Sequence, residues 1–245
     1  MANSYFQFKE FTVHQDRAAM KVSTDACLFG ASVADICSEW DENYSVLDIG
    51  TGTGLLSLML AQQFKGLITG VDIDPAATQQ ASENFAASPW ASRLRAVHKD
   101  IREFHGDYDF IIANPPFYSN DLKSPDYLRN QARHSDTLDL EELFDSIRHL
   151  LTPNGTVAIL IPFHRLNELI ANASEFICWN LILVRQTPNH KLFRAIVFLS
   201  YANPDTHPGL RSGLVGDAIK ELTIQEQGAY TPEVLKLLKP YYLNL

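Results

Sequence analysis

The chain of 245 residues carries 29 acidic and 20 basic side chains, and its formal net charge of −9 argues against a broad nucleic-acid-binding surface. Hydrophobic residues make up 46% of it, which suits one globular domain with a sizeable core. We therefore predict a single domain over residues 1–245, with an extension (1–43), a core (44–203) and a tail (204–245). No stretch approaches the roughly 18 apolar residues of a membrane span, so no membrane association is expected.

The cysteines and the first residues indicate the compartment. Cys27, Cys37 and Cys178 are odd in number and form no CxxC pair, so we expect reduced cysteines that pack in the interior. The N-terminus lacks the basic start and apolar run of a signal peptide. These features favour a cytoplasmic protein without a metal, and nothing in the sequence implies an obligate protein partner.

Apolar residues alternate along the first dozen positions, which predicts a short β-hairpin. A helix is expected at 26–36, capped by Ser23, Thr24 or Asp25. Strands and helices then alternate, as in a parallel sheet with right-handed crossovers. The predicted strands are Ser45–Ile49, Leu67–Asp72, Leu94–His98, Phe110–Ala113 and Thr156–Ile161.

Helices are predicted between and after these strands from their 3.6-residue periodicity and their stop signals. They are Leu55–Phe64, a helix from Pro75 to about Ala86, Leu140–Leu151, Leu166–Phe176, and a last one around Pro232–Leu238. Two β-rich runs, Leu181–Gln186 and Ala195–Tyr201, predict an antiparallel pair that ends the sheet. The expected fold is α/β, a doubly wound, mostly parallel sheet of seven strands.

A glycine loop follows the first strand of this sheet. Gly50, Gly52 and Gly54 carry no Cβ, so the backbone there can come close to a ligand at the start of a helix. The GxGxG pattern alone does not choose a ligand, because dinucleotide-binding loops look much the same.

Carboxylates at three successive strand ends narrow the choice. Asp48 precedes the loop, where it can attract an ammonium group. Asp72, followed by Ile73, ends the second strand about 20 residues on, where an acid can hold both ribose hydroxyls. Asp100 and the backbone of Ile101 follow the third strand and could hold an adenine edge. Ammonium, ribose and adenine together describe S-adenosylmethionine better than NAD.

Each of these acids also has an ordinary structural interpretation. Asp72 and Asp74 can cap the following helix, and for Asp74, which precedes Pro75, capping is the favoured interpretation. Asp100 on its own is more often a loop carboxylate. The alignment of the set at the strand ends, where open α/β sheets bind ligands, favours the cofactor site.

The chemistry is indicated by Asn114, Pro115, Pro116 and Phe117, which close the apolar run 110–113. The side-chain carbonyl of Asn114 and the backbone carbonyl of Pro115 can both accept hydrogen bonds from an NH2 group and bend its nitrogen out of plane. Proline fixes φ, so both acceptors are in place before the substrate arrives. Phe117 can stack on a base. The alternative is a rigid turn after a strand; with the glycine loop upstream, methyl transfer to nitrogen is favoured.

This order of motifs resembles the class I S-adenosylmethionine-dependent methyltransferases, which have a Rossmann-like fold and whose [DNS]-P-P-[YF] signature marks amino-methylating members. Residues 11–17, 20–25, 132–134, 230–233 and 241–243 look like the bacterial tRNA1(Val) adenine-37 N6-methyltransferases. The resemblance implies a tRNA substrate, methylated at the adenine 3′ of the anticodon.

The resemblance also implies roles for residues outside the two motifs. The segment with Lys21, Thr24 and Asp25 would fold over the methionine end of the cofactor, although Ser23 stands where the family commonly has glycine. Arg133 and His134 follow the catalytic loop and are candidates for phosphate contacts. The favoured interpretation of the remaining basic residues is a scatter of solvated charges: Lys9, Arg17, Arg129, Lys191 and Arg194.

Four other functions remain as alternatives. Guanine N2-methyltransferases of ribosomal RNA often carry Asn-Pro-Pro-Phe, but many duplicate the domain, for which this chain is too short. Glutamine N5-methyltransferases of release factors carry a larger helical domain before the glycine loop. A noncatalytic RNA-binding module would have no use for an aimed amine acceptor. A nicotinamide-dependent dehydrogenase is the least favoured.

Overall fold

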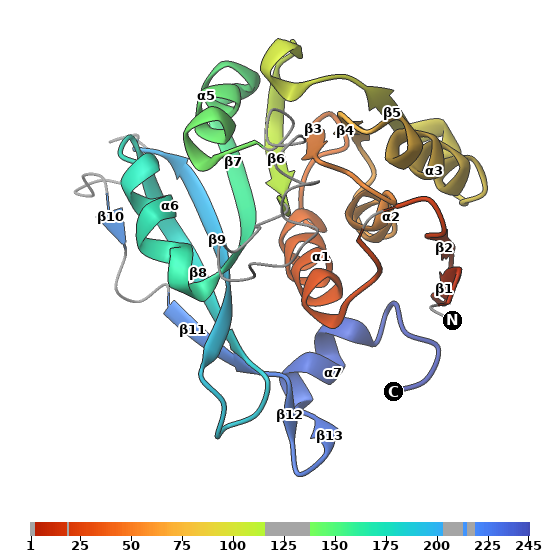
Figure 1. Ribbon diagram of the computed structural model, residues 1–245, viewed down its shortest axis with the longest axis vertical. Helices are drawn as coiled ribbons and strands as arrows, with labels where there is room; N and C mark the ends of the chain where they lie inside the picture. Colours follow the sequence, from red (N-terminus) through yellow and green to blue (C-terminus); the bar gives the residue numbers. More distant parts are fainter. Residues whose placement is uncertain (1–2, 19, 116–137, 203–212, 215–218) are drawn as a thin grey trace, which may run out of the picture.

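The computed structural model describes residues 3–18, 20–115, 138–202, 213–214 and 219–245, and within them the centre is a nine-stranded sheet (Figure 1). Its strands are β3 (Ser45–Ile49), β4 (Leu67–Asp72), β5 (Leu94–His98), β6 (Tyr108–Ala113), β7 (Leu151–Pro162), β8 (Phe176–Arg185), β9 (Leu192–Tyr201), β10 (Gly213–Leu214) and β11 (Ile219–Thr223). Seven of them run in the order β8-β9-β7-β6-β3-β4-β5, as expected for a doubly wound sheet. Pairing is parallel from β7 to β5, and β9 is antiparallel to both β7 and β8.

Helices cover both faces of the sheet, as Figure 1 shows. They are α1 (Thr24–Cys37), α2 (Leu55–Ala61), α3 (Pro75–Ala86), α5 (Leu140–Leu150), α6 (Leu166–Asn172) and α7 (Pro232–Leu238), with 3-10 turns η1 (Ala91–Arg93), η2 (Ile101–Glu103) and η4 (Phe163–Arg165). In β6, Phe110 and Ile112 pack in the cluster that contains α1 and α2, whereas Ile111 and Ala113 pack in the cluster that contains α5. This alternation buries both sheet faces, so β6 reads as an unbroken apolar run.

The predicted antiparallel pair is confirmed as β8 and β9, but the prediction that it ends the sheet is wrong. β10 and β11, from the predicted tail, both pair in parallel with β8. The first three residues of β11 are exposed, so this edge strand lacks the apolar alternation that would reveal it. β8 also begins at Phe176, where a helix was predicted to continue, because α6 already ends at Asn172.

The boundary between α5 and β7 differs from the prediction as well. The helix ends at Leu150, and β7 begins at once at Leu151 rather than at Thr156. Tyr108 pairs with Leu151 and Phe110 pairs with Thr156, so the Pro-Asn-Gly turn between them bulges out of the ladder. Pro153, Asn154 and Gly155, which act as the stop signal for the predicted helix, therefore interrupt a strand instead of preceding it.

The N-terminal hairpin is confirmed as β1 (Tyr5–Gln7) and β2 (Thr12–His14), and the C-terminal segment packs against it. The backbone N–H of Lys9 donates to the carbonyl of Tyr241 (2.8 Å), and the hydroxyl of Tyr241 donates to the carbonyl of Met59 in α2 (3.2 Å). Next to it, Tyr242 packs against the core cluster that contains α1. A second hairpin, β12 (Gln225–Glu226) with β13 (Ala229–Tyr230), precedes α7. This packing supports our proposal of one domain.

The three cysteines are free and buried, which confirms their packing role. In the part of the chain that the structure describes, none of the helices combines the length and the apolar character needed to cross a bilayer. The same residues hold no group of three or more His, Cys, Asp or Glu side chains suited to a metal ion.

Candidate active site

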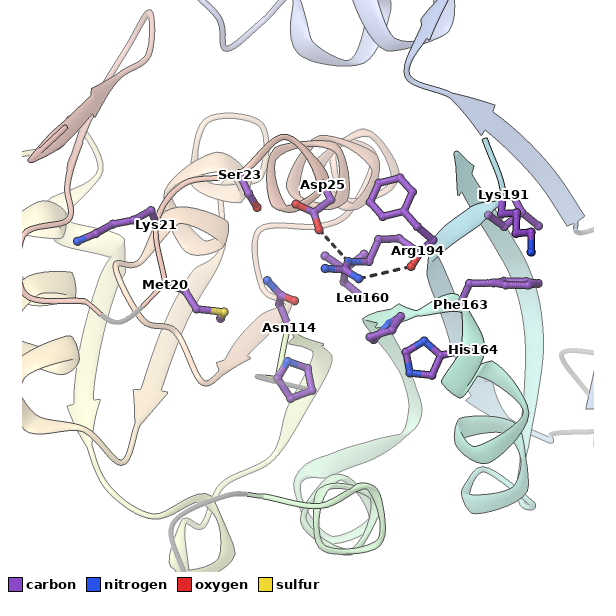
Figure 2. A pocket seen from close by; sticks show the side chains of 14 residues that line it. Met20, Lys21, Ser23, Asp25, Asn114, Leu160, Phe163, His164, Lys191 and Arg194 are labelled. Atoms are coloured by element: carbon purple, nitrogen blue, oxygen red, sulfur yellow. Dashed lines mark hydrogen bonds and ion pairs between the residues drawn. The ribbon is translucent and has the colours of Figure 1, made fainter. Parts of the chain in front are cut away.

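An open cavity of about 1060 Å³ lies beyond the carboxyl end of β6 (Figure 2). One side is formed by the segment that leads into α1, with Met20, Lys21 and Ser23. The other side is formed by the end of β7, by η4 and by the start of β9. Asn114 and Pro115 lie between the two sides, where open α/β sheets place their ligands.

Asn114 is positioned by the last residue of β6. In the sheet, Ala113 at the end of β6 pairs with Ile49 at the end of β3. Asn114 therefore lies next to the start of the glycine loop, which follows β3. Its side chain is half-buried and points into the cavity toward the start of α1, as Figure 2 shows. Within the described part of the chain its carboxamide makes no hydrogen bond, so both of its polar atoms are available to a ligand. Pro115 is buried and fixes the backbone behind it.

The glycine loop requires the conformations that only glycine adopts without strain. Gly50, Gly52 and Gly54 have φ of 70°, 57° and 79°, all in the left-handed region. Gly54 is the N-cap of α2, and a Cβ there would lie 2.4 Å from the ring of Phe85 in α3. A Cβ on Gly50 would meet no atom within 4 Å, so the backbone there faces open space. The backbone at Gly50 is thus open to approach, and its contact with a ligand stays a prediction.

Asp48 lies beneath this loop and is completely buried. Its Oδ2 accepts hydrogen bonds from the hydroxyls of Thr51 (2.8 Å) and Ser57 (2.7 Å), whereas its Oδ1 is buried with no partner in the described residues. Burial raises the pKa of Asp48 to about 6, against the opposing effect of the two hydroxyls. The carboxylate thus anchors the glycine loop through its hydrogen bond from Thr51. Its Oδ1 can still accept a hydrogen bond from a cationic group.

Asp72 ends β4 on the loop side of the sheet. Its Oδ2 accepts from the backbone N–H of Gly52 (2.8 Å) and its Oδ1 from that of Asp74 (2.9 Å). Burial raises its pKa, partly offset by these hydrogen bonds. The next side chain, Ile73, is 39% exposed, which is unusual for an isoleucine and leaves an apolar surface beside the carboxylate. Asp74 accepts from Ala76 N–H (2.8 Å), which confirms it as the N-cap of α3.

Asp100 lies at the end of β5, but its carboxylate is engaged locally. It accepts from the backbone N–H of Arg102 (3.0 Å) and pairs with the guanidinium of the same residue (2.6 Å). These interactions, led by the side-chain hydrogen bond from Arg102, lower the pKa of Asp100. Because the side chain of Ile101 is buried, only the backbone of this residue can contact a ligand.

Lys21, Thr24 and Asp25, the three predicted site residues before and at the start of α1, differ in the directions and contacts of their side chains. The ammonium of Lys21 donates to the backbone carbonyls of Gln15 and Ala18 and points away from Asn114 (Figure 2). Thr24 lies at the contact with Tyr242. Asp25 lines the cavity and accepts from Nε of Arg194 on β9 at 2.8 Å. Of the three, Lys21 and Asp25 line the cavity, and the carboxylate of Asp25 is directed at Arg194.

The sequence interpretation missed the side of the cavity formed by β7 and β9. Lys191 and Arg194 line it together with Phe163, so these two cations are not part of a scatter over the surface. No local signal reveals the pair of Arg194 with Asp25, because the two are 169 positions apart. The remaining predicted site residues, Pro116, Phe117, Arg133 and His134, lie outside the described residues, as does Arg129.

Comparison with known proteins assigns this site to a family. The family model described as "Methyltransferase small domain" matches residues 20–167, which include the glycine loop, Asp72, Asp100 and Asn114. The chain belongs to this family. It is therefore a methyltransferase, as the two motifs predict.

Relatives within the family match over the whole chain. Proteins named tRNA1(Val) (adenine(37)-N6)-methyltransferase from Bacteroides fragilis and Phocaeicola vulgatus are 36% and 39% identical to it, over 100% of both chains in each case. Among solved structures, a predicted O-methyltransferase from Agrobacterium tumefaciens is similar with a TM-score of 0.65 and 18% identity, over 90% of this chain and 100% of that one. TrmN from Thermus thermophilus has a TM-score of 0.53 and 22% identity, over 70% of this chain and 48% of that one. These structures confirm the class I methyltransferase fold.

Proposed function

We propose that this methyltransferase transfers a methyl group from S-adenosylmethionine to N6 of an adenine in tRNA, namely adenine 37 of tRNA1(Val). The observation that carries the proposal is the carboxamide of Asn114, which is free of hydrogen bonds in the described residues and faces a cavity beside the glycine loop. The full-length relatives that bear this activity in their names support the choice of substrate.

The residues at the cavity suit the chemistry of an exocyclic amine. Such a nitrogen is a weak nucleophile, because its lone pair is delocalised into the ring. The side-chain oxygen of Asn114 and the carbonyl of Pro115 accept its two N–H bonds and turn the lone pair out of the plane. Both acceptors are fixed in advance by the buried proline and the end of β6, so catalysis rests on positioning. The nitrogen loses its proton after it has gained the methyl group, and no strong base is required.

We place the cofactor at the ends of β3 and β4, beside the glycine loop. S-adenosylmethionine supplies a methyl group on a positively charged sulfur. We propose that the backbone of Gly50 and Gly52 lies against its amino-acid part, with the unsatisfied Oδ1 of Asp48 favouring the ammonium. Asp72 would accept from the ribose hydroxyls, and the exposed Ile73 would cover one face of the adenine.

In this arrangement the edge of the adenine lies at the residues that follow β5. The backbone N–H and carbonyl of Ile101 can form hydrogen bonds with this edge. The carboxylate of Asp100, although paired with Arg102, would accept a further hydrogen bond from it. Lys21 and Thr24 would act by shaping the segment that covers the methionine end, since Lys21 bonds to backbone carbonyls in that segment.

Replacing Asp72 with alanine should weaken cofactor binding by about 1–3 kcal/mol, on the scale of losing a charge-assisted hydrogen bond. Titration calorimetry with S-adenosylhomocysteine measures this loss directly. Asp74→Ala is the matched control, because that carboxylate caps α3 and should change the stability of the fold but not the affinity for the cofactor. An unchanged affinity in Asp72→Ala would remove Asp72 from the cofactor site.

The substrate is tested by incubating the protein with labelled S-adenosylmethionine and total tRNA from cells that lack the gene. We expect the label in N6-methyladenosine, in one tRNA, at the position 3′ of the anticodon. Label in N2-methylguanosine, or in a protein glutamine when cell extract replaces tRNA, would replace the proposed substrate with one of the two alternatives. Absence of label in every acceptor would contradict methyl transfer by this chain.

A further inference from the structure

Cationic and aromatic side chains form the side of the cavity that faces away from Met20 and Lys21, and the proposed chemistry uses none of them. They come from η4, which follows β7, and from the first residues of β9. We call this surface the β7–β9 wall: Phe163, His164, Lys191, Phe193 and Arg194. Figure 2 shows its side chains across the cavity from Met20 and Lys21.

The charge of the wall is opposite to that of the whole chain, which is −9. Among the described residues that line the cavity, the single carboxylate is that of Asp25, and it is paired with Arg194. Lys191 is exposed and has no ion-pair partner among the described residues, so its charge is available to a ligand. His164, also exposed, lies on the same wall. In an acidic protein this local positive potential draws an anionic ligand to the cavity and away from the remaining surface.

Two aromatic rings lie among these cations. Phe163, the first residue of η4 after β7, is half-buried and lines the cavity. The guanidinium carbon of Arg194 is 5.5 Å from the centre of the ring of Phe193, within the range of a cation–π interaction. Arg194 is thus held by Asp25 on one side and by Phe193 on the other. On this surface the exposed Lys191 and the held Arg194 therefore lie beside the aromatic rings of Phe163 and Phe193.

We propose that the β7–β9 wall binds the unpaired nucleotides of RNA next to the base that enters the cavity. Lys191 would contact a backbone phosphate, and Phe163 would stack on a neighbouring base. Cations that alternate with aromatic faces suit a single-stranded segment or loop, because a duplex presents its phosphates but not its base faces. The inference rests on the proposed function, since it places the flanking nucleotides relative to the methylated one.

The test is equilibrium binding of an unmodified tRNA transcript and of its isolated anticodon stem-loop, at saturating S-adenosylhomocysteine and over a range of salt. Lys191→Ala should raise the Kd on the order of three- to tenfold and reduce the slope of log K against log salt by about 0.7–0.9, the share of one phosphate. Phe163→Leu should raise the Kd about fivefold or more with an unchanged slope, because stacking releases no counterions. Both variants should bind S-adenosylhomocysteine as the wild type does.

Lys65→Ala is the matched control, because Lys65 is an exposed lysine in the turn before β4. It lies at the amino end of that strand, whereas the cavity lies at the carboxyl ends of the strands. Its Kd and salt slope should equal those of the wild type. Wall variants that bind both RNAs as the wild type does, or an equal loss in Lys65→Ala, would overturn the inference. So would a wild-type protein that binds no RNA and methylates a protein instead.

The two proposals fail separately. If the label appears in guanine while Lys191→Ala and Phe163→Leu still weaken RNA binding as described, the proposed adenine is wrong and the wall stands. If N6-methyladenosine forms and the wall variants bind normally, the wall is wrong and the proposed function stands.

Discussion

Replacing Asn114 with alanine should reduce methyl transfer by about 100- to 1,000-fold, the size of effect seen when one preorganised polar contact to the reacting group is lost. The reason is that the amine loses one of two fixed acceptors and its lone pair returns to the plane of the ring. Cofactor affinity should stay nearly unchanged, because Asn114 lies on the substrate side of the strand ends. Single-turnover rates with tRNA and calorimetry with S-adenosylhomocysteine separate the two effects.

Asn114→Asp is the control for this result. A carboxylate still accepts hydrogen bonds, and the signature of amino-methylating members includes aspartate at this position, so it should retain more activity than Asn114→Ala. Both variants should unfold at the wild-type temperature, since the carboxamide makes no hydrogen bond in the described part of the chain. Equal loss of cofactor affinity and turnover in Asn114→Ala would identify Asn114 as a residue of the fold or of the cofactor site instead.

Replacing Gly54 with alanine should lower the free energy of unfolding by about 2–5 kcal/mol. Two costs combine: about 1–2 kcal/mol for a side chain in the left-handed region, and about 1–3 kcal/mol for forcing a methyl group against the buried ring of Phe85. Urea denaturation without cofactor measures the sum.

Gly228→Ala separates the two costs. Gly228 has a φ of 83°, close to the 79° of Gly54, but a Cβ there would meet no atom within 4 Å. It should therefore show the backbone cost alone, about 1–2 kcal/mol. If both substitutions destabilise equally, the close approach of the glycine loop to α3 is not rigid, and the loop is free to move away from Phe85.

The sequence predicts this fold well where strands and helices alternate. β3, β4 and β5 match their predicted bounds, because each short β-rich run is delimited by turn residues and by the start of the next helix or turn. The errors fall where local signals are weak. The strand β11 is mostly exposed, so its sequence carries no alternating apolar pattern. Phe176 is an apolar residue that suits the end of a helix and the start of β8 equally well. Only tertiary pairing decides these segments.

The site divides in a similar way. The side made of consecutive motifs was predicted: the glycine loop, Asp72 and Asn114 all lie at the strand ends. The β7–β9 wall was not predicted, because Lys191 and Arg194 join the cavity only through contacts with elements that are distant in sequence. The net charge of −9 argues only against a broad basic surface, because it does not say where individual cations lie.

The contact between Lys9 and Tyr241 has a consequence for biosynthesis. The N-terminal hairpin hydrogen-bonds through Lys9 to Tyr241, a residue made more than two hundred codons later. The packing of the hairpin is therefore completed only when translation has passed that residue. Strands β3 to β7 are made earlier, so we expect the centre of the sheet to pair before the hairpin is fixed in place.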